Sequence, residues 1–296
     1  MSLPDFLGIG APKSGTCWLD VNLRTHPQIW MLPVKELHYF SVKRKNPLCR
    51  GLISRYRTMA MRFQLHSRLS TYKCNWAYHN FLWDLHYFLG TYNDEWFASS
   101  FRPAPGQISG NIESLYDLQL SSEDIAHVHL LMPQLKIIYL LRNPIERTWS
   151  EIMMFLCRFQ KIPFDAVTQG QCMQIYRRSA EGHSQYLKNF SRWNSFFPHS
   201  QIFIGYYEEI SEHPEELLLR IFRFLGVNAS SEHISKNVRQ RVFGGIGFPI
   251  PLQFKIFLTH EYYPLLQGLH KKFGSYCTNW LKEADEFLAS NHSIAE

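Results

Sequence analysis

The stretch Leu135–Leu141, which reads Leu-Lys-Ile-Ile-Tyr-Leu-Leu, is a nearly continuous apolar run with the length of one β-strand. Successive side chains of a strand point to opposite faces, so a strand that is apolar at consecutive positions must be covered on both faces. Strands of parallel sheets meet this condition, because helices pack on both sides of them. We therefore expect this run to be an inner strand of a parallel sheet.

Two other apolar runs have strand length, and each of the three runs is followed by a segment with helical character. The predicted strand and helix pairs are Phe6–Gly10 with Thr16–Arg24, Leu135–Leu141 with Pro144–Phe155, and Gln201–Tyr207 with Pro214–Leu225. Pro144 suits the first turn of a helix, and Gly226 suits the position that follows a helix. This alternation predicts an α/β fold, with a central parallel sheet flanked by helices and with ligands beyond the carboxyl ends of the strands.

The length of 296 residues fits one large domain, and a content of 45% hydrophobic and 19% charged residues is that of a globular protein. We expect a single domain over residues 1–296, with a helical, aromatic-rich insertion at 41–105 and a C-terminal helical segment at 250–296. No apolar run approaches the roughly 18 residues of a spanning helix, and the N-terminus lacks the pattern of a signal peptide. The sequence thus predicts no membrane span and a cytoplasmic location.

Basic residues are concentrated in one segment of the chain. Nine Lys or Arg residues and no Asp or Glu lie between Lys43 and Lys73, while the whole chain has a net charge of +6. The remainder therefore carries −3, since its 22 basic residues meet 25 acidic ones. A charge excess this local predicts a surface for an anionic ligand rather than for nucleic acid, which usually meets a broader basic field.

The segment Gly10–Trp18 joins a predicted strand to the start of a predicted helix, where backbone N–H groups and the helix dipole favour a phosphate. Its two glycines have the spacing of the nucleotide-binding pattern GxxxxGK[ST], but Thr16 stands at the lysine position and Lys13 lies inside the loop. A P-loop-like site for a ligand with one 5′-phosphate, and without a metal, fits this arrangement better than a nucleoside triphosphate site. The alternative is an ordinary tight turn with a solvated lysine.

Two motifs in this chain carry a family resemblance. Pro12–Leu19 resembles the 5′-phosphosulfate loop of sulfotransferases that use 3′-phosphoadenosine 5′-phosphosulfate (PAPS), and Leu141–Ser150 resembles their 3′-phosphate motif. Lys35–Phe40 and Gly182–Tyr207 are similar to further family segments in the expected order. The resemblance covers roughly residues 5 to 226 and is closest to the bacterial and glycosaminoglycan-type branch, in which a Glu of a Lys-Glu-x-His motif is the base.

The resemblance implies an enzyme that transfers a sulfuryl group from PAPS to an acceptor hydroxyl by in-line displacement, leaving 3′-phosphoadenosine 5′-phosphate (PAP) and requiring no metal. Such a transfer needs a base for the acceptor hydroxyl and a cation near the leaving phosphate. Glu36 is the predicted base, His38 is its rival, and Lys13 is the predicted cation. The predicted cofactor-binding residues are Lys13, Ser14, Gly15, Thr16, Cys17, Trp18, Arg142, Ser150, Tyr186, Arg239, Arg241, Phe243 and Gly244.

Several of these residues have a plain structural alternative. The alternative for Glu36 is a surface carboxylate paired with Lys35 or an Arg, and the alternative for Arg142 is an ion pair with Glu146, four residues further along the helix. His38 lies between apolar and aromatic neighbours, where a histidine is more often a packed, hydrogen-bonded residue. The structure has to decide between these arrangements.

The chain departs from the family at the segment Gly110–Tyr116, which reads Gly-Asn-Ile-Glu-Ser-Leu-Tyr. Many relatives have Gly-Glu-x-Ser/Thr-Pro-x-Tyr there, along the acceptor pocket, and only the first and last residues match. Glu113 is either a second carboxylate near the acceptor or a surface residue.

Other functions stay open. A nucleotide kinase is disfavoured, because no lysine stands at the usual position and no convincing magnesium carboxylate follows. A non-catalytic polyanion-binding or nucleotide-binding protein of the same fold remains the alternative. The acceptor is a hydroxyl of a carbohydrate, a lipid, a polyketide alcohol or a small phenol, and the basic segment within 41–105 predicts an anionic or carrier-bound acceptor beside it.

Overall fold

The computed structural model describes residues 2–43, 83, 86–87, 90–180, 182–242 and 247–291. Nearly all of the basic segment predicted from Lys43 to Lys73 lies outside these residues, as do Phe243 and Gly244. The predictions that concern them are therefore not tested by the structure.

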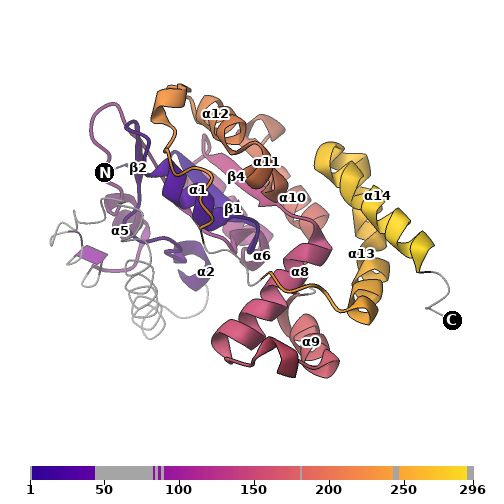
Figure 1. The fold of residues 1–296 in the computed structure, drawn as a ribbon. Coiled ribbons are helices and arrows are strands. Elements are labelled where there is room, and N and C mark those ends of the chain that lie inside the picture. The colour runs from indigo at the N-terminus through magenta and orange to yellow at the C-terminus, as the bar shows by residue number, and fades with distance from the viewer. Residues whose placement is uncertain are drawn as a thin grey trace.

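A five-stranded parallel sheet forms the centre of the molecule (Figure 1). Its strands are β1 (Phe6–Gly10), β2 (Ile29–Met31), β3 (Ile108–Ile112), β4 (Lys136–Leu141) and β5 (Ile202–Tyr206). They lie in the order β2-β3-β1-β4-β5, and each neighbouring pair is parallel. The predicted α/β fold is confirmed, and so are the three predicted strands. The strands β2 and β3 were not predicted.

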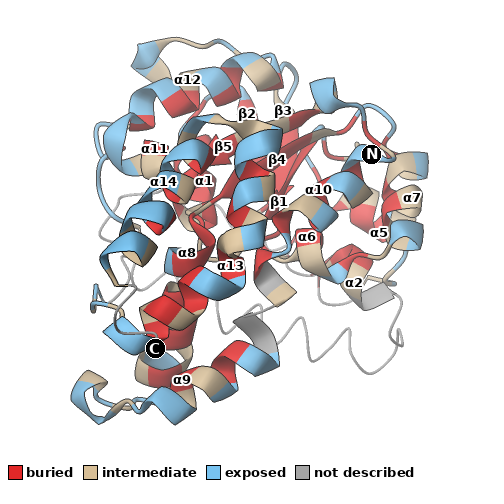
Figure 2. Cartoon of the chain, turned by 90° about the vertical axis from the view of Figure 1, so that its right-hand side faces the viewer, coloured by how far each residue is buried: buried red, intermediate tan, exposed pale blue. Residues whose placement is uncertain are grey.

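The strand β4 shows why its sequence is apolar throughout. Ile137, Tyr139 and Leu141 belong to one buried cluster of side chains, whereas Ile138 and Leu140 belong to a second cluster. The second cluster contains residues of α1 (Thr16–Leu23) and α12 (Pro214–Leu225). The first contains residues of α7 (Ser122–Leu131), α8 (Pro144–Met153), α10 (Tyr186–Asn194) and α13 (Leu252–Phe273). Figure 2 shows the buried strands between helices whose outer sides are exposed. The sheet is thus covered on both faces, as the apolar run requires.

The α-helices that the structure describes follow the predicted pattern between the strands. They are α1 (Thr16–Leu23), α2 (Tyr39–Lys43), α5 (Asp94–Ser99), α6 (Tyr116–Gln119), α7 (Ser122–Leu131), α8 (Pro144–Met153), α9 (Gln169–Ile175), α10 (Tyr186–Asn194), α11 (Tyr207–Glu212), α12 (Pro214–Leu225), α13 (Leu252–Phe273) and α14 (Ser275–Ser290). Short 3-10 turns occupy Phe164–Ala166, Gly182–Ser184, His199–Gln201 and Ser231–His233.

The ends of two helices confirm the signals in the sequence. Pro144 is the first residue of α8, where the side chain of Asn143 accepts a hydrogen bond of 3.0 Å from the N–H of Ile145. Gly226 ends α12 with φ of 83°, in the left-handed region that glycine adopts without strain. The helix predicted through Phe155 is α-helical only to Met153 and continues as a π-helical turn over Met154–Phe159.

The described part of the aromatic-rich insertion packs onto the same core as the sheet. The ring of Phe97 in α5 stacks on Tyr39 in α2, with centroids 4.6 Å apart, and contacts Phe40 and Phe101. At the opposite side of the molecule, α13 and α14 lie side by side, and α13 contacts α8 and α10 (Figure 1). These packing contacts give the described residues one continuous fold.

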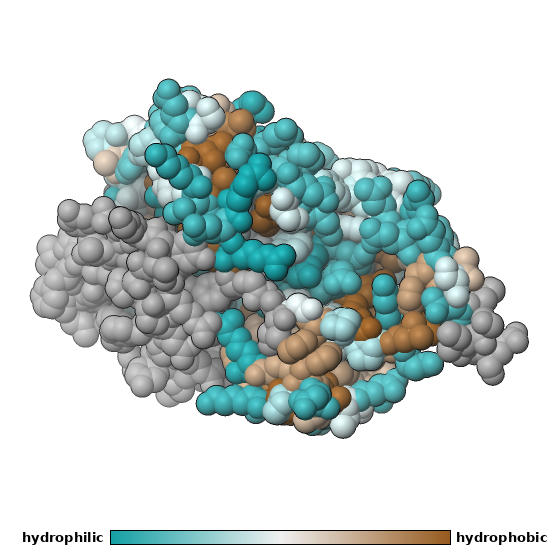
Figure 3. Space-filling view, viewed as in Figure 1, coloured by the Kyte–Doolittle hydropathy of each residue, from teal (hydrophilic) through white to brown (hydrophobic). Residues whose placement is uncertain are grey.

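On the face shown in Figure 3, hydrophobic residues form separate small patches among hydrophilic ones. Among the helices that the structure describes, none is long and apolar enough to cross a membrane.

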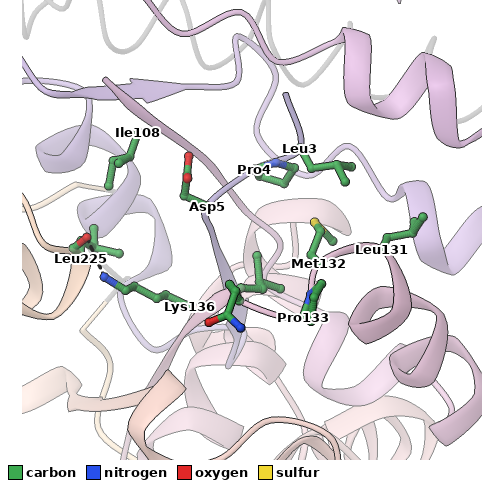
Figure 4. Close-up of a pocket in the computed structure, with 11 residues that line it drawn as sticks. Leu3, Pro4, Asp5, Ile108, Leu131, Met132, Pro133, Lys136 and Leu225 are labelled. Carbon is green, nitrogen blue, oxygen red and sulfur yellow. Dashed lines mark hydrogen bonds between the residues drawn. The ribbon is translucent and has the colours of Figure 1, made fainter. Parts of the chain in front are cut away.

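The amino ends of the strands border a shallow cavity of about 270 Å³ (Figure 4). Its two charged side chains already have backbone partners. Lys136 donates a hydrogen bond of 2.9 Å to the carbonyl of Leu225, and Asp5 accepts one of 2.7 Å from the N–H of Ser109. At this end of the sheet, the two charged side chains are thus already hydrogen-bonded to the backbone. The predicted site residues lie elsewhere.

Candidate functional site at the carboxyl ends of the strands

The carboxyl ends of four neighbouring strands bring the candidate residues together. The loop 11–15 follows β1, the segment with Glu36 follows β2, Glu113 follows β3 directly, and Arg142 follows β4 directly. Because β1 lies between β3 and β4, the chain passes from one half of the sheet to the other at this point. In open α/β sheets, ligands bind at such a switch point.

The loop before α1 has the features of a phosphate site. Gly15 is the residue that precedes the helix, with φ of 88°, and no side chain caps the helix there. The N–H groups of the first turn, at Thr16, Cys17 and Trp18, therefore have neither an intrahelical partner nor a capping side chain. A left-handed backbone at this position favours glycine. The predicted loop thus leaves several N–H donors at the positive end of a helix, which suits a phosphate.

The other predicted loop residues pack behind the loop or beside it. Ser14 is fully buried beside Tyr186. The indole N–H of Trp18, also buried, donates a hydrogen bond of 2.7 Å to the carbonyl of Val238. This bond holds the segment next to Arg239 against α1. The half-buried thiol of Cys17 is free.

Two predicted cations lie on the loop and at its edge. Arg142 donates a hydrogen bond of 3.1 Å to the carbonyl of Lys13, and its guanidinium lies 4.2 Å from the ring centre of Tyr207. Burial lowers the pKa of Lys13, and the positive charges of Arg142 and Arg158 lower it further. A phosphate would relieve this repulsion, so the donor set fits an anion. The alternative partner of Arg142, Glu146, lies at 4.0 Å and is 48% exposed, which makes it a weak competitor.

The residues predicted around the 3′-phosphate, and Tyr186, which the family resemblance places near the adenine, occupy different surroundings. Ser150 lies on α8, two turns into the helix, and is half-buried. Tyr186 is fully buried, and its hydroxyl donates a hydrogen bond of 3.0 Å to the carbonyl of Arg142, so it supports that residue from inside. Arg239 and Arg241 are exposed, and Arg239 lies 3.4 Å from Glu215. The structure thus places Tyr186 against Arg142 and Ser150 on α8, and it leaves both later arginines at the surface.

Arg147, in the middle of the 3′-phosphate motif, is not available to a ligand. It is fully buried and forms an ion pair of 2.6 Å with Glu151 and a hydrogen bond of 2.8 Å with Ser184. The motif therefore combines a structural arginine with the candidate ligand residues.

Glu36 lies in a network that reaches the phosphate loop. Its carboxylate is 3.2 Å from Nζ of Lys35 and accepts a short hydrogen bond from Ser114. Nζ of Lys35 is also 3.3 Å from Sγ of Cys17 on α1. Burial alone would raise the pKa of Glu36, but Lys35, the bond from Ser114 and the nearby His38 outweigh it and lower the pKa to about 2. Glu36 is thus paired with Lys35, as its structural alternative states, but the pair is mostly buried and lies beside the loop.

The pKa of Glu113 is shifted in the opposite direction. The residue is fully buried, its carboxylate accepts hydrogen bonds of 3.1 and 3.2 Å from the N–H of His38, and Asn111 donates one of 2.8 Å. Burial raises the pKa of Glu113 well above its usual range, and the charge of Glu36 raises it further. The sequence interpretation of Glu113 as a surface residue is therefore wrong.

His38 lies between the two carboxyl groups. Its Nε2 is 4.0 Å from Glu36 and its Nδ1 is 3.6 Å from Glu113. Burial lowers the pKa of His38, which keeps the ring neutral at neutral pH. His38 therefore stays a rival of Glu36 on geometric grounds.

Four residues of this site were not predicted from the sequence. Lys35 was considered only as an ion-pair partner that would give Glu36 a structural role, and Arg158 lies beyond Phe155, the predicted end of its helix. Asn111 and Ser114 stood inside the segment that departs from the family pattern. That departure was the one signal that could have found the last two.

Comparisons with known proteins agree with this fold. A family model for the sulfotransferase domain matches residues 3–245. Carbohydrate sulfotransferase 15 from Rattus norvegicus is 23% identical over 262 residues, and that from Homo sapiens is 24% identical over 271. Both alignments cover 78% of this chain and 45% of the relative, so the chain spans about half the length of these curated relatives.

Solved structures are similar at the level of the fold. A sulfotransferase from Alicyclobacillus acidocaldarius has a TM-score of 0.62 at 20% identity, over 95% of this chain and 99% of that one. A mouse sulfotransferase in complex with PAP has a TM-score of 0.52 at 13% identity, over 95% of this chain and 89% of that one. The chain belongs to the sulfotransferase family, and the resemblance seen in its motifs is confirmed.

Proposed function

We propose that this sulfotransferase moves a sulfuryl group from PAPS to a hydroxyl of its acceptor. One observation carries the proposal: Nζ of Lys35 lies 3.2 Å from Glu36 and 3.3 Å from Cys17, so it connects a charged carboxylate to the phosphate loop. In-line transfer needs the acceptor oxygen and the leaving phosphate oxygen on opposite sides of one sulfur atom, with the base beside the acceptor oxygen. This connection supports such an arrangement.

The donor supplies a sulfuryl group attached to an oxygen of its 5′-phosphate. Glu36 accepts the proton of the acceptor hydroxyl while the acceptor oxygen forms its bond to sulfur and the bond from sulfur to the phosphate oxygen breaks. Lys13 and the N–H groups at the start of α1 bind the phosphate as it gains negative charge. Arg142 and Ser150 bind the 3′-phosphate, and PAP leaves with the electron pair of the broken bond.

Glu36 suits this role in its charge state, although a carboxylate with a pKa of about 2 is a weak base. The acceptor hydroxyl becomes far more acidic as its oxygen bonds to sulfur, so a weak base accepts the proton late in the step. His38 is neutral and is the competing base. Variants of the two residues decide between them.

Calorimetry with PAP tests the cofactor. We expect PAP to bind with equal affinity with and without a chelator, because the donor set consists of N–H groups and cations. Loss of binding in the chelator, or equal competition by ATP with Mg²⁺, would contradict this cofactor. Among the residues that the structure describes, no group of three His, Cys, Asp or Glu side chains could hold a metal.

A screen of acceptors with labelled PAPS tests the reaction itself. The curated relatives are named for carbohydrates, so carbohydrate hydroxyls come first in this screen, followed by lipid and polyketide alcohols and small phenols. The alternative, a non-catalytic nucleotide- or polyanion-binding protein of this fold, predicts PAP binding without transfer to any acceptor. One assay thus separates the two functions.

The basic segment supports an anionic or carrier-bound acceptor, although Lys43–Lys73 lies almost wholly outside the described residues. Neutralising Arg55, Arg57 and Arg62 together should raise the acceptor KM, flatten its dependence on salt and leave PAP affinity unchanged. A KM that stays constant across salt concentrations would remove this segment from the acceptor site. The single domain over 1–296, the cytoplasmic location and the lack of nucleic-acid binding stay predictions.

A further inference from the structure

Four consecutive contacts join the segment after β3 to the segment that carries Glu36. The N–H of Glu36 donates to the carbonyl of Ile112 at 3.1 Å, and the N–H of His38 donates to Glu113 at 3.1 Å. Ser114 donates to the carboxylate of Glu36. Finally, the N–H of Phe40 donates to the hydroxyl of Tyr116 at 3.1 Å. Residues 112–116 thus hold residues 36–40 step by step.

The held segment has an unusual backbone. Glu36 has φ of 62° and His38 has φ of 59°, so both lie in the left-handed region that residues with a side chain rarely adopt. Each such residue costs about 1 kcal/mol or more unless the surroundings compensate for it. Glu113 compensates directly, because both of its carboxylate oxygens accept from the N–H of His38.

The carboxyl group of Glu113 stands where the family pattern has Ser or Thr, and Asn111 stands where the pattern has Glu. Residues i and i+2 of an extended chain point to the same side. Accordingly, the amide of Asn111 donates to Oε1 of Glu113 at 2.8 Å. The departure noted in the sequence is therefore a matched pair that brings a carboxyl group to the backbone of His38.

We infer that Glu113 is a positioning residue for the transfer: it holds the segment Glu36–His38 in its left-handed conformation and determines which ring nitrogen of His38 faces Glu36. This inference rests on the proposed function for its catalytic meaning. Glu113 itself is buried and touches neither donor nor acceptor in this role.

The groups around Glu113 bear on which nitrogen of the His38 ring carries the hydrogen. The titratable groups near its carboxyl are Lys35, Glu36, His38 and Tyr116. Burial and the charge of Glu36 raise the pKa of Glu113 well above its usual range, which favours its protonated form. Both oxygens accept from the N–H of His38 and Oε1 also accepts from Asn111, so the proton of a protonated Glu113 belongs on Oε2, 3.6 Å from Nδ1 of His38. In that state Nδ1 is the unprotonated nitrogen, and Nε2 carries its hydrogen toward Glu36.

Glutamine is the matched variant, because its amide copies a neutral carboxyl group with one acceptor and one donor. Glu113→Ala should lower kcat by about 10²-fold through misplacement of Glu36, with PAP affinity unchanged. E113Q should restore most of this rate, to within about fivefold of the wild type. An E113Q variant as slow as Glu113→Ala would overturn the inference.

Nitrogen NMR of the protein with labelled histidine measures the tautomer of the His38 ring without any enzymatic reaction. The His38 signals are identified by their loss in His38→Ala. We expect the Nε2–H form in the wild type and in E113Q. An Nδ1–H ring in the wild type would overturn the inference even if Glu113→Ala fails to fold. If the wild type instead shows the Nε2–H form but transfers no sulfate from PAPS, the proposed function fails while the role of Glu113 stands.

Discussion

The two ends of the sheet differ in how they treat charge and backbone strain. At the amino ends, Asp5 and Lys136 are bound to backbone groups, and the shallow cavity between them has no unpaired charge to offer (Figure 4). At the carboxyl ends, Lys13, Glu36 and His38 have left-handed backbones, and the charges of Lys35 and Glu36 are largely removed from water.

This difference shows which end of the sheet tolerates energetically unfavourable features. Buried charges and rare backbone conformations persist only where surrounding contacts enforce them, and they concentrate at functional sites. The same sheet therefore carries one end built for stability and one end built for binding and transfer. Four predictions test this contrast, beginning with the largest effect.

Glu36→Gln should reduce kcat by about 10² to 10⁴-fold, the usual contribution of a general base. PAP binding should persist, because Glu36 does not contact the predicted phosphate donors. The measurement is steady-state transfer of labelled sulfate, with calorimetry for PAP. His38→Ala is the matched control. A larger loss there, in a folded protein, would transfer the role of base to His38.

Lys13→Ala should reduce kcat by about 10²-fold, and it should weaken PAP binding by a smaller factor. The reason is that the leaving phosphate gains charge during the reaction, so the ammonium interacts more strongly with the transition state than with the bound donor. Comparing kcat with the PAP dissociation constant checks this. Equal losses in both quantities would assign Lys13 to binding alone.

The ion pair of Glu36 should make the protein sensitive to acid. Its pKa is about 2 in the folded state against 4.5 for the free side chain, so the pair stabilises the fold above pH 4.5. This stabilisation, about 3 kcal/mol at most, is lost as the pH falls from 4.5 to 2. Urea unfolding at stepwise lower pH measures it. The curve of Glu36→Gln should be flatter in this range, and parallel curves would rule the contribution out.

Lys136→Met, at the amino end, should cost about 1 kcal/mol of stability, because it removes the hydrogen bond to the carbonyl of Leu225 and keeps the apolar stem. The transfer rate should equal that of the wild type. Thermal unfolding and the transfer assay check the two parts. A slowed transfer would show that the two ends of the sheet are coupled and would break the contrast between them.

Much of the fold could be predicted from short stretches of sequence. The apolar run of β4 already contains the information that helices cover both faces, and Pro144 and Gly226 mark helix ends by their own backbone chemistry. The strands β2 and β3 escaped prediction for local reasons. Ile29–Met31 is too short to form a recognisable run, and Ile108–Ile112 is interrupted by Ser109, Gly110 and Asn111.

The candidate site divides in the same way. The loop Gly10–Trp18 is one continuous segment, so its suitability for a phosphate can be read from residue types and spacing. The contact between Glu113 and His38 joins positions 75 residues apart, and it exists because β2 and β3 pair in parallel, so the chain segments after both strands leave the sheet at the same edge. No local pattern contains that pairing.

The sequence alone determined which groups this protein can use: a glycine-bearing loop with Lys13, a Lys-Glu-x-His segment, and an arginine after a buried strand. Only the tertiary structure decided the state of its carboxyl groups. Glu36 and Glu113 are the same residue type, yet Lys35 lowers the pKa of one while burial and the charge of Glu36 raise the pKa of the other. A pKa depends on the distances to other charges and to water, and these distances exist only once the chain has folded.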